Sequence, residues 1–120
     1  MNKWVLLEHK VYSANSLDLH YDFLFENGID CLTCKFLKLP LLNKASIEIS
    51  KQPNHRLVWL SRIEHELSGN RGLAKRIDHG TFKNVSDNFD SGYYRFILDG
   101  EFLYGLFEIS ANSCRLSKNY

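Results

Sequence analysis

An Asn-Gly dipeptide between two apolar runs constrains the fold of this chain more than any other feature of its sequence. Leu19–Phe25 precedes Asn27-Gly28, and Ile29–Leu39 follows it up to Pro40. Asn and Gly tolerate the positive φ angles of a tight hairpin turn, and proline ends a strand because it has no N–H to donate. The sequence therefore predicts a β-hairpin in which these two runs pair.

The same pattern recurs near the C-terminus, where Asp99-Gly100 separates Tyr93–Leu98 from Glu101–Ile109. Shorter apolar or alternating runs predict further strands at Trp4–Leu7, Ala45–Ile49, His55–Leu60 and within Leu73–Phe82. Polar or glycine-containing segments predict the loops and turns between them, at Lys10–Asp18, Lys51–Asn54, Ser68–Gly72, Asp78–Gly80 and Val85–Ser91. We find no amphipathic helix pattern longer than about three turns.

Many short strands with regular turns are typical of an antiparallel barrel or sandwich. Aromatic residues make up 13% of the chain, which favours strands over helices. Since closing a sheet removes its exposed edges, we predict an all-β, mainly antiparallel fold: a compact closed β-barrel with little helix. The 120 residues suffice for one core, so residues 1–120 are expected to form a single domain, with 110–120 a loose polar tail.

Three cysteines, an odd number in a short chain, argue against a disulfide framework. Cys31 and Cys34 form a C-x-x-C on a predicted strand, where side chains three positions apart point to opposite faces. Together with Cys114, they are expected to be free, buried thiols. Met1–Glu8 has too few apolar residues for a signal peptide or a membrane span, so we expect a cytoplasmic protein without a membrane partner.

The charge balance limits the kinds of partner that the chain is expected to bind. It carries 15 Lys and Arg against 14 Asp and Glu, which gives a net charge of +1. A general electrostatic attraction to nucleic acid is therefore not expected. Any binding of nucleic acid must use a local basic patch.

A His-x-Asp pair on the predicted strand Leu19–Phe25 is the first sign of chemistry. His20 and Asp22 are two residues apart, so they project from the same face. His9 closes the first predicted strand and His55 opens a later one, so a closed sheet would bring these side chains together. Two histidines and a carboxylate around an open position suit Mn, Fe, Co or Zn without discriminating among them. The pattern also allows a barrel whose histidines are only hydrogen-bonded.

A series of motifs runs from Trp4 to Ile109, and its members are Val5–His9, Leu19–Gly28, Thr33–Pro40, Asn54–Leu57, Ser68–Gly72, Asp78–Phe82 and Asp99–Gly105. No single motif is specific. Their order and spacing together resemble the 3′-phosphoesterase domain of bacterial ATP-dependent DNA ligase D, and more closely the short stand-alone proteins related to that domain.

This resemblance implies a compact β-barrel with a manganese-dependent activity. The family removes a 3′-terminal ribonucleoside and then the remaining 3′-phosphate, which leaves the 3′-hydroxyl that a ligase or polymerase needs. Carried over to this chain, the metal ligands are His9, Asp22 and His55. His20 is then the neighbouring catalytic histidine that contacts the scissile phosphate.

The chain departs from the ligase domain at Leu24, where that domain has an Arg two residues after the Asp. Arg56, Arg71 and Lys38 are the local cations that would take over phosphate binding. Arg and Lys side chains pair with phosphate oxygens, so we assign catalytic roles to Arg56 and Arg71 beside His20.

The predicted function is a phosphoesterase that removes 3′-phosphates or 3′-terminal ribonucleotides from nucleic acid in DNA repair. Mn²⁺ is the expected metal, with Zn²⁺, Co²⁺ and Fe²⁺ left open. The expected partners are DNA or RNA 3′ ends and a repair ligase or polymerase, and the chain is expected to be a monomer. Two alternatives stay open: a module of the same fold that binds nucleic-acid ends or another protein without turnover, and a non-haem Fe(II) oxygenase, which uses the same ligand types.

Overall fold

The computed structural model describes residues 2–13, 15–39, 46–66, 72–86 and 93–118. Within these residues the chain consists of antiparallel strands and a short 3-10 helix, η1 (Leu57–Leu60). The strands are β1 (Asn2–Ser13), β2 (Ser16–Asn27), β3 (Asp30–Phe36), β4 (Ile47–Glu48), β5 (Ser50–Arg56), β6 (Glu64–Glu66), β7 (Leu73–Asn84), β8 (Tyr94–Gly100), β9 (Tyr104–Ile109) and β10 (Ser113–Ser117). The prediction of an all-β, antiparallel fold with little helix is confirmed.

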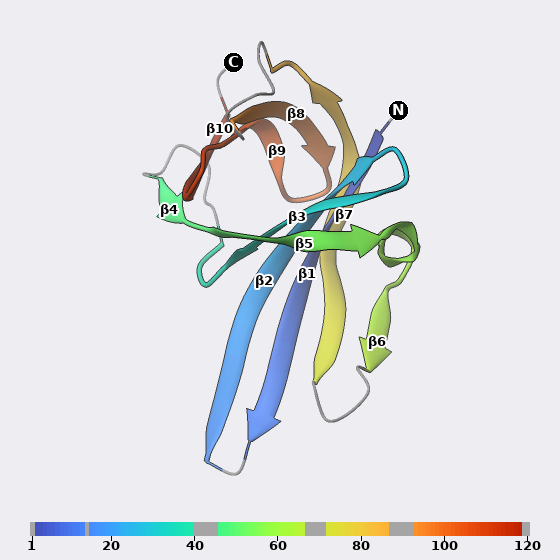
Figure 1. Ribbon diagram of the computed structural model, residues 1–120, viewed down its shortest axis with the longest axis vertical. Coiled ribbons are helices and arrows are strands. Elements are labelled where there is room, and N and C mark those ends of the chain that lie inside the picture. The colour runs from blue at the N-terminus through green and yellow to red at the C-terminus, as the bar shows by residue number, and fades with distance from the viewer. Residues whose placement is uncertain (1, 14, 40–45, 67–71, 87–92, 119–120) are drawn as a thin grey trace.

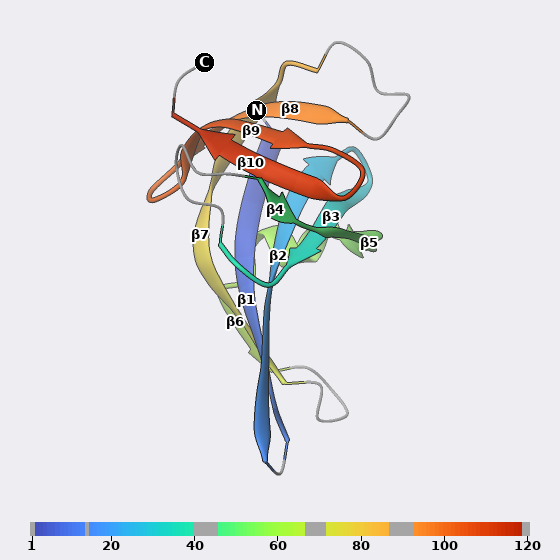
Figure 2. The same cartoon turned by 90° about the vertical axis from the view of Figure 1, so that its left-hand side faces the viewer.

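The strands form one curved sheet in the order β4-β10-β9-β8-β7-β1-β2-β3-β5, and β6 pairs with β7 off this path. Strands β8–β10 fold over one end of the long strands β1, β2 and β7 (Figures 1 and 2). Strand β5 follows β4 in the chain after Ile49 alone, so one segment pairs first with β10 and then with β3. No ladder joins β4 to β5 in the described residues, and the prediction of a closed barrel is wrong for this reason.

The first predicted hairpin is present, with its turn displaced by one residue. Asn27 pairs with Asp30, so the turn consists of Gly28 and Ile29 rather than Asn27-Gly28. Gly28 has a φ of 72°, which suits the first central position of a tight hairpin turn. The return strand ends at Phe36, earlier than the predicted Leu39.

The second hairpin is also present, but its predicted turn is wrong. Asp99 pairs with Tyr104, so Asp99-Gly100 belongs to the β8 end of the ladder and residues 101–103 form the connection. The buried carboxylate of Asp78 stabilises this connection by accepting backbone N–H groups, those of Glu101 (3.1 Å), Phe102 (3.1 Å) and Leu103 (2.7 Å). A side chain from another strand therefore determines the turn.

Strand β7 passes without a break through Asp78–Gly80, which was predicted as a turn. Its pairing with β1 shifts register between Leu6 and Leu7, as in a β-bulge. A Cβ atom at Gly80 would lie 1.8 Å from the backbone oxygen of Asp99. Glycine at this position therefore permits a close approach of two strands, and does not mark a turn.

Strands β1 and β2 form a hairpin and are both longer than predicted. Lys10–Asp18 was expected to be a loop, but the ladder continues from His9–His20 out to the pair of Ser13 and Ser16. This end of the hairpin projects beyond the rest of the sheet (Figure 1). Polar residues are favourable there because the strand ends are exposed to solvent, as the 68% exposure of Tyr12 illustrates.

The C-terminal segment is not a loose tail over its described part. Ser113–Ser117 forms β10, which pairs with both β9 and β4. Leu116 and Cys114 alternate inward from this strand and are 0% and 2% exposed. Burial of these two side chains outweighs the polar character of their neighbours.

The segment from Ser50 to Leu60 also differs from the prediction. Pro53 lies inside β5 rather than in a turn, which is possible because β5 is an edge strand whose outer N–H groups need no partner. Of the predicted strand His55–Leu60, only His55 and Arg56 belong to β5, and η1 begins at Leu57. Of the predicted strand Ala45–Ile49, Ile47–Glu48 forms β4, and Ala45 lies outside the described residues, as does most of the Ser68–Gly72 loop.

The curved sheet encloses the main core on its inner face. This core is rich in Phe and draws on strands from both halves of the sheet, with Trp4, Leu6, Phe23, Phe25, Cys34, Phe36, Ile49, Phe82, Phe96, Leu98, Phe107, Ile109, Cys114 and Leu116. A second cluster on the other face contains Val5, Leu7, Leu24 and Cys31, and Trp59 and Leu60 of η1 pack against it. The two C-x-x-C thiols thus lie on opposite faces, and all three cysteines are free and buried, as predicted.

Candidate metal centre

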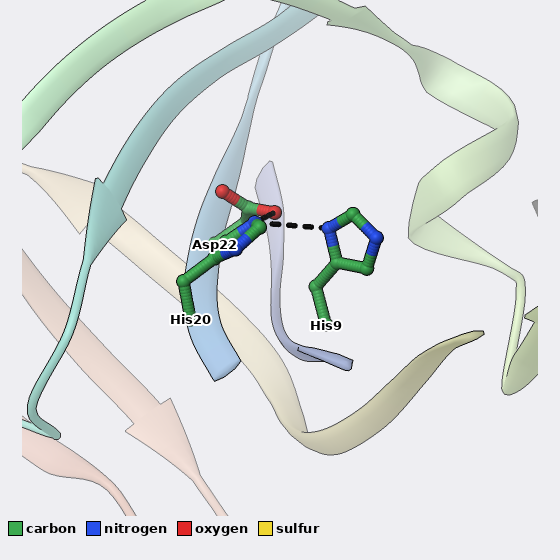
Figure 3. Close-up of side chains that lie close together, drawn as sticks. All are labelled: His9, His20 and Asp22. Carbon is green, nitrogen blue, oxygen red and sulfur yellow. Dashed lines mark hydrogen bonds and ion pairs between the residues drawn. The ribbon is translucent and has the colours of Figure 1, made fainter. Parts of the chain in front are cut away.

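The ladder between β1 and β2 brings three polar side chains together. His9 pairs with His20, and Asp22 pairs with Leu7. Cross-strand partners point to the same face, and Leu7 belongs to the second cluster. His9, His20 and Asp22 therefore share the face that carries this cluster, where Figure 3 shows the two rings turned toward each other beside the carboxylate.

The distances within this group match those of ligands around a single ion. His9 Nδ1 lies 2.9 Å from His20 Nε2, which lies 3.4 Å from Asp22 Oδ2. All three ligand atoms lie within 4.8 Å of one another. Donor atoms bound at about 2.1 Å to one ion are about 3.0 Å apart in an octahedron and about 3.4 Å apart in a tetrahedron. Two imidazoles and a carboxylate thus have the donor types and separations that a divalent metal needs.

His20 is held in its neutral form. The residue is 8% exposed, and its Nδ1 is buried without a hydrogen-bond partner among the described residues. Burial lowers the pKa of His20 below its usual 6.5, and the Asp22 carboxylate opposes this shift only in part. Electrostatic repulsion from His9 and from the ammonium of Lys35 lowers the pKa of His20 further. A neutral imidazole is the form that binds a metal.

His55, the third predicted ligand, lies on the same face but outside this group. It pairs with Cys31, a member of the second cluster. Its Nδ1 lies 3.1 Å from the Pro53 carbonyl oxygen and 3.0 Å from Thr33 Oγ1, whose own proton goes to the Cys31 carbonyl. Both neighbours can accept a hydrogen bond from Nδ1–H, so these contacts favour the tautomer with a lone pair on Nε2. A backbone carbonyl holding one ring nitrogen in this way is typical of histidines that bind a metal through the other.

The structure does not bring the predicted cations to the group. Arg56 follows His55 on β5 and pairs with Asp30, so its exposed side chain points to the opposite face. Lys38 is exposed and lies beyond the end of β3. Arg71 lies outside the described residues.

Two other cations, missed from the sequence, lie on the face of the group. Lys35 pairs with Asp22, and Arg76 pairs with Leu7. The position of Lys35 follows from the hairpin. When the turn is placed at Gly28-Ile29, counting residues outward along both strands pairs Asp22 with Lys35. The one-residue displacement of the predicted turn concealed this pairing.

Comparisons with known proteins add no relative to this picture. No protein-family model matches the chain, and no curated protein matches it. Among the described residues, no helix is long and apolar enough to span a membrane. The resemblance to the 3′-phosphoesterase domain stays a prediction.

Proposed function

We propose that this chain is a metal-dependent phosphoesterase that processes 3′ ends of nucleic acid, with Mn²⁺ as the metal. The observation that carries the proposal is the convergence of His9 Nδ1, His20 Nε2 and Asp22 Oδ2 at distances suited to one ion. The choice of substrate and metal rests on the sequence resemblance.

The carboxylate of Asp22 and neutral imidazoles of the histidines would hold the metal. His9 and Asp22 belong to both the predicted ligand set and the observed group. His20 is the third member of the observed group. The sequence resemblance instead gives this place to His55, whose tautomer is suited to binding through Nε2, and His20 would then face the phosphate. When bound, a divalent metal polarises a phosphate oxygen and acidifies a water molecule.

The low pKa of His20 bears on its role beside the phosphate. Because burial keeps the imidazole neutral, His20 donates a hydrogen bond through one nitrogen and adds no full charge to the site. The neutral ring is suited to accept a proton from a water molecule or to orient it. Burial at 8% exposure holds the ring in one place, which lowers the entropic cost of positioning it.

One observation favours the alternative, a module that binds 3′ ends without turnover. Leu24, at the position of the Arg in the ligase domain, is 0% exposed and packs with Val5, Leu7 and Cys31. No charged group is present at this position to stabilise the phosphate. Phosphate release and oligonucleotide binding, measured on the same protein, separate the two functions.

The test is phosphate release from an oligonucleotide with a 3′-phosphate, with and without Mn²⁺. The wild-type protein should release phosphate only with metal, and His9→Ala and Asp22→Asn should each lower the rate by at least about 100-fold, since loss of a ligand costs more than the 10–100-fold typical of outer-shell changes. Tight binding of the oligonucleotide without turnover at any divalent metal would establish the binding module instead.

A matched control is His79→Ala, which removes an exposed histidine from β7, outside the group. This variant should keep the wild-type rate. Equal rates in the wild type and both ligand variants would refute the assignment. Far-UV circular dichroism of each variant shows whether a lost rate reflects a lost fold.

A further inference from the structure

A row of paired residues crosses four strands through the candidate metal centre. Lys35 on β3 pairs with Asp22 on β2, which pairs with Leu7 on β1, which pairs with Arg76 on β7. Partners in a ladder point to the same face, and neighbouring strands lie about 4.8 Å apart. Lys35 and Arg76 therefore lie on opposite sides of Asp22. Lys35 is one strand away and Arg76 is two strands away.

Neither cation has an anionic partner among the described residues. Within the part of the chain that the structure describes, neither Lys35 nor Arg76 forms an ion pair, although Lys35 stands directly opposite a carboxylate. Both side chains are partly buried. A partly buried cation without a counter-charge gains more from binding an anion than a fully solvated one, since less water screens the attraction.

An open groove borders one end of this row, at Lys35. It has a volume of about 850 Å³, and Lys35 lines it together with Lys38, Ser50 and Asn112. Lys35 also shares the face of the sheet that carries His20 and Asp22. Lys35 thus belongs both to the lining of the groove, which also contains Glu48, and to the row that passes through the metal centre.

We propose that Lys35 and Arg76 bind the phosphate group of the substrate from the two sides of the His9–His20–Asp22 group. The inference rests on the proposed function and adds the phosphate-binding residues to it. Lys supplies a compact charge, and the guanidinium of Arg offers a fork of N–H donors that fits two phosphate oxygens. This pair would bind the phosphate without a charged residue at the position of Leu24.

The test is steady-state kinetics of Lys35→Gln and Arg76→Gln on a 3′-phosphate oligonucleotide with saturating Mn²⁺. Each variant should raise KM, or lower kcat/KM, by at least about 10-fold, as expected for loss of a hydrogen bond to a charged group. Lys35→Arg should recover most of the loss because it keeps the charge. Lys75→Gln, an exposed cation next to Arg76 on the opposite face of β7, is the matched control and should leave KM unchanged.

Binding of Mn²⁺ alone, followed by electron paramagnetic resonance, gives a readout independent of turnover. Lys35→Gln and Arg76→Gln should bind the metal as the wild type does, because they act on the phosphate. An inactive wild type would refute the proposed function. If the wild type is active, an unchanged KM in both Lys35→Gln and Arg76→Gln would refute the phosphate-binding pair alone. An effect confined to one of these two variants, or a loss of metal binding in either, would also refute it.

Discussion

Asp78→Asn is the change that tests most sharply how the fold is held together. The carboxylate is 4% exposed and accepts four backbone N–H groups. Oδ1 accepts from His79 (2.8 Å) and Glu101 (3.1 Å), and Oδ2 accepts from Phe102 (3.1 Å) and Leu103 (2.7 Å). One carboxylate thus holds the connection between β8 and β9 against β7.

The expected cost follows from the number of bonds lost. The Asn amide keeps one oxygen, so at most two of the four N–H groups retain an acceptor, and its NH₂ faces the other two. A hydrogen bond to a charged group contributes about 1.5–3 kcal/mol, so the loss of two lowers the free energy of unfolding by about 3–6 kcal/mol. Since a domain is stable by roughly 5–15 kcal/mol in total, the variant should be close to unfolded.

Urea unfolding followed by tryptophan fluorescence measures this cost. With a slope of about 2 kcal/mol per molar urea, the midpoint of Asp78→Asn should fall by about 1.5–3 M. The control is Asp99→Asn, an exposed carboxylate on the neighbouring strand, which should change stability by less than about 0.5 kcal/mol. A loss below about 1 kcal/mol in Asp78→Asn would show that the connection does not depend on this carboxylate.

Three further predictions follow from the site and the core. Thr33→Val removes the hydroxyl that contacts His55 Nδ1 and should weaken Mn²⁺ affinity about 10-fold, measured by electron paramagnetic resonance; unchanged affinity would exclude His55 as a ligand. Because the pKa of His20 is lowered by folding, the unfolded chain binds more protons. The metal-free protein should therefore lose stability as pH falls below about 6.5, and the His20→Gln variant should lose less. Urea midpoints that fall with pH by the same amount in both proteins would contradict this. Burial raises the pKa of Cys34 to about 11 and of Cys114 to about 12, so at pH 8 these thiols should react with a disulfide reagent only as the protein unfolds, and rapid native labelling would contradict their burial.

The parts of the fold that the sequence predicts are those governed by local rules. Both hairpins follow from short turn dipeptides between apolar runs, and the opposite faces of Cys31 and Cys34 follow from strand alternation. The predicted turn of the second hairpin was wrong because Asp78, from another strand, holds residues 101–103 as the connection. Gly80 and Pro53 were wrongly predicted to lie in turns. Gly80 is needed because the backbone of Asp99 lies close to it, and Pro53 is tolerated because β5 is an edge strand.

The candidate site was predicted in part. Alternation on one strand places His20 with Asp22, and the structure adds His9 as the direct partner of His20 in the ladder. The same ladder carries Lys35, whose place required a register that the sequence pattern missed by one residue. Lone cations such as Arg56 could not be placed, because the face to which a side chain points depends on where its strand begins.

The most direct test of this account is the location of Mn²⁺ in crystals of the protein soaked with the metal. Anomalous diffraction identifies manganese independently of its surroundings. The account predicts one strong peak within coordination distance of His9 Nδ1 and the Asp22 carboxylate, with a third imidazole from His20 or His55. Manganese bound elsewhere, or no peak at this group under conditions that support phosphate release, would contradict it.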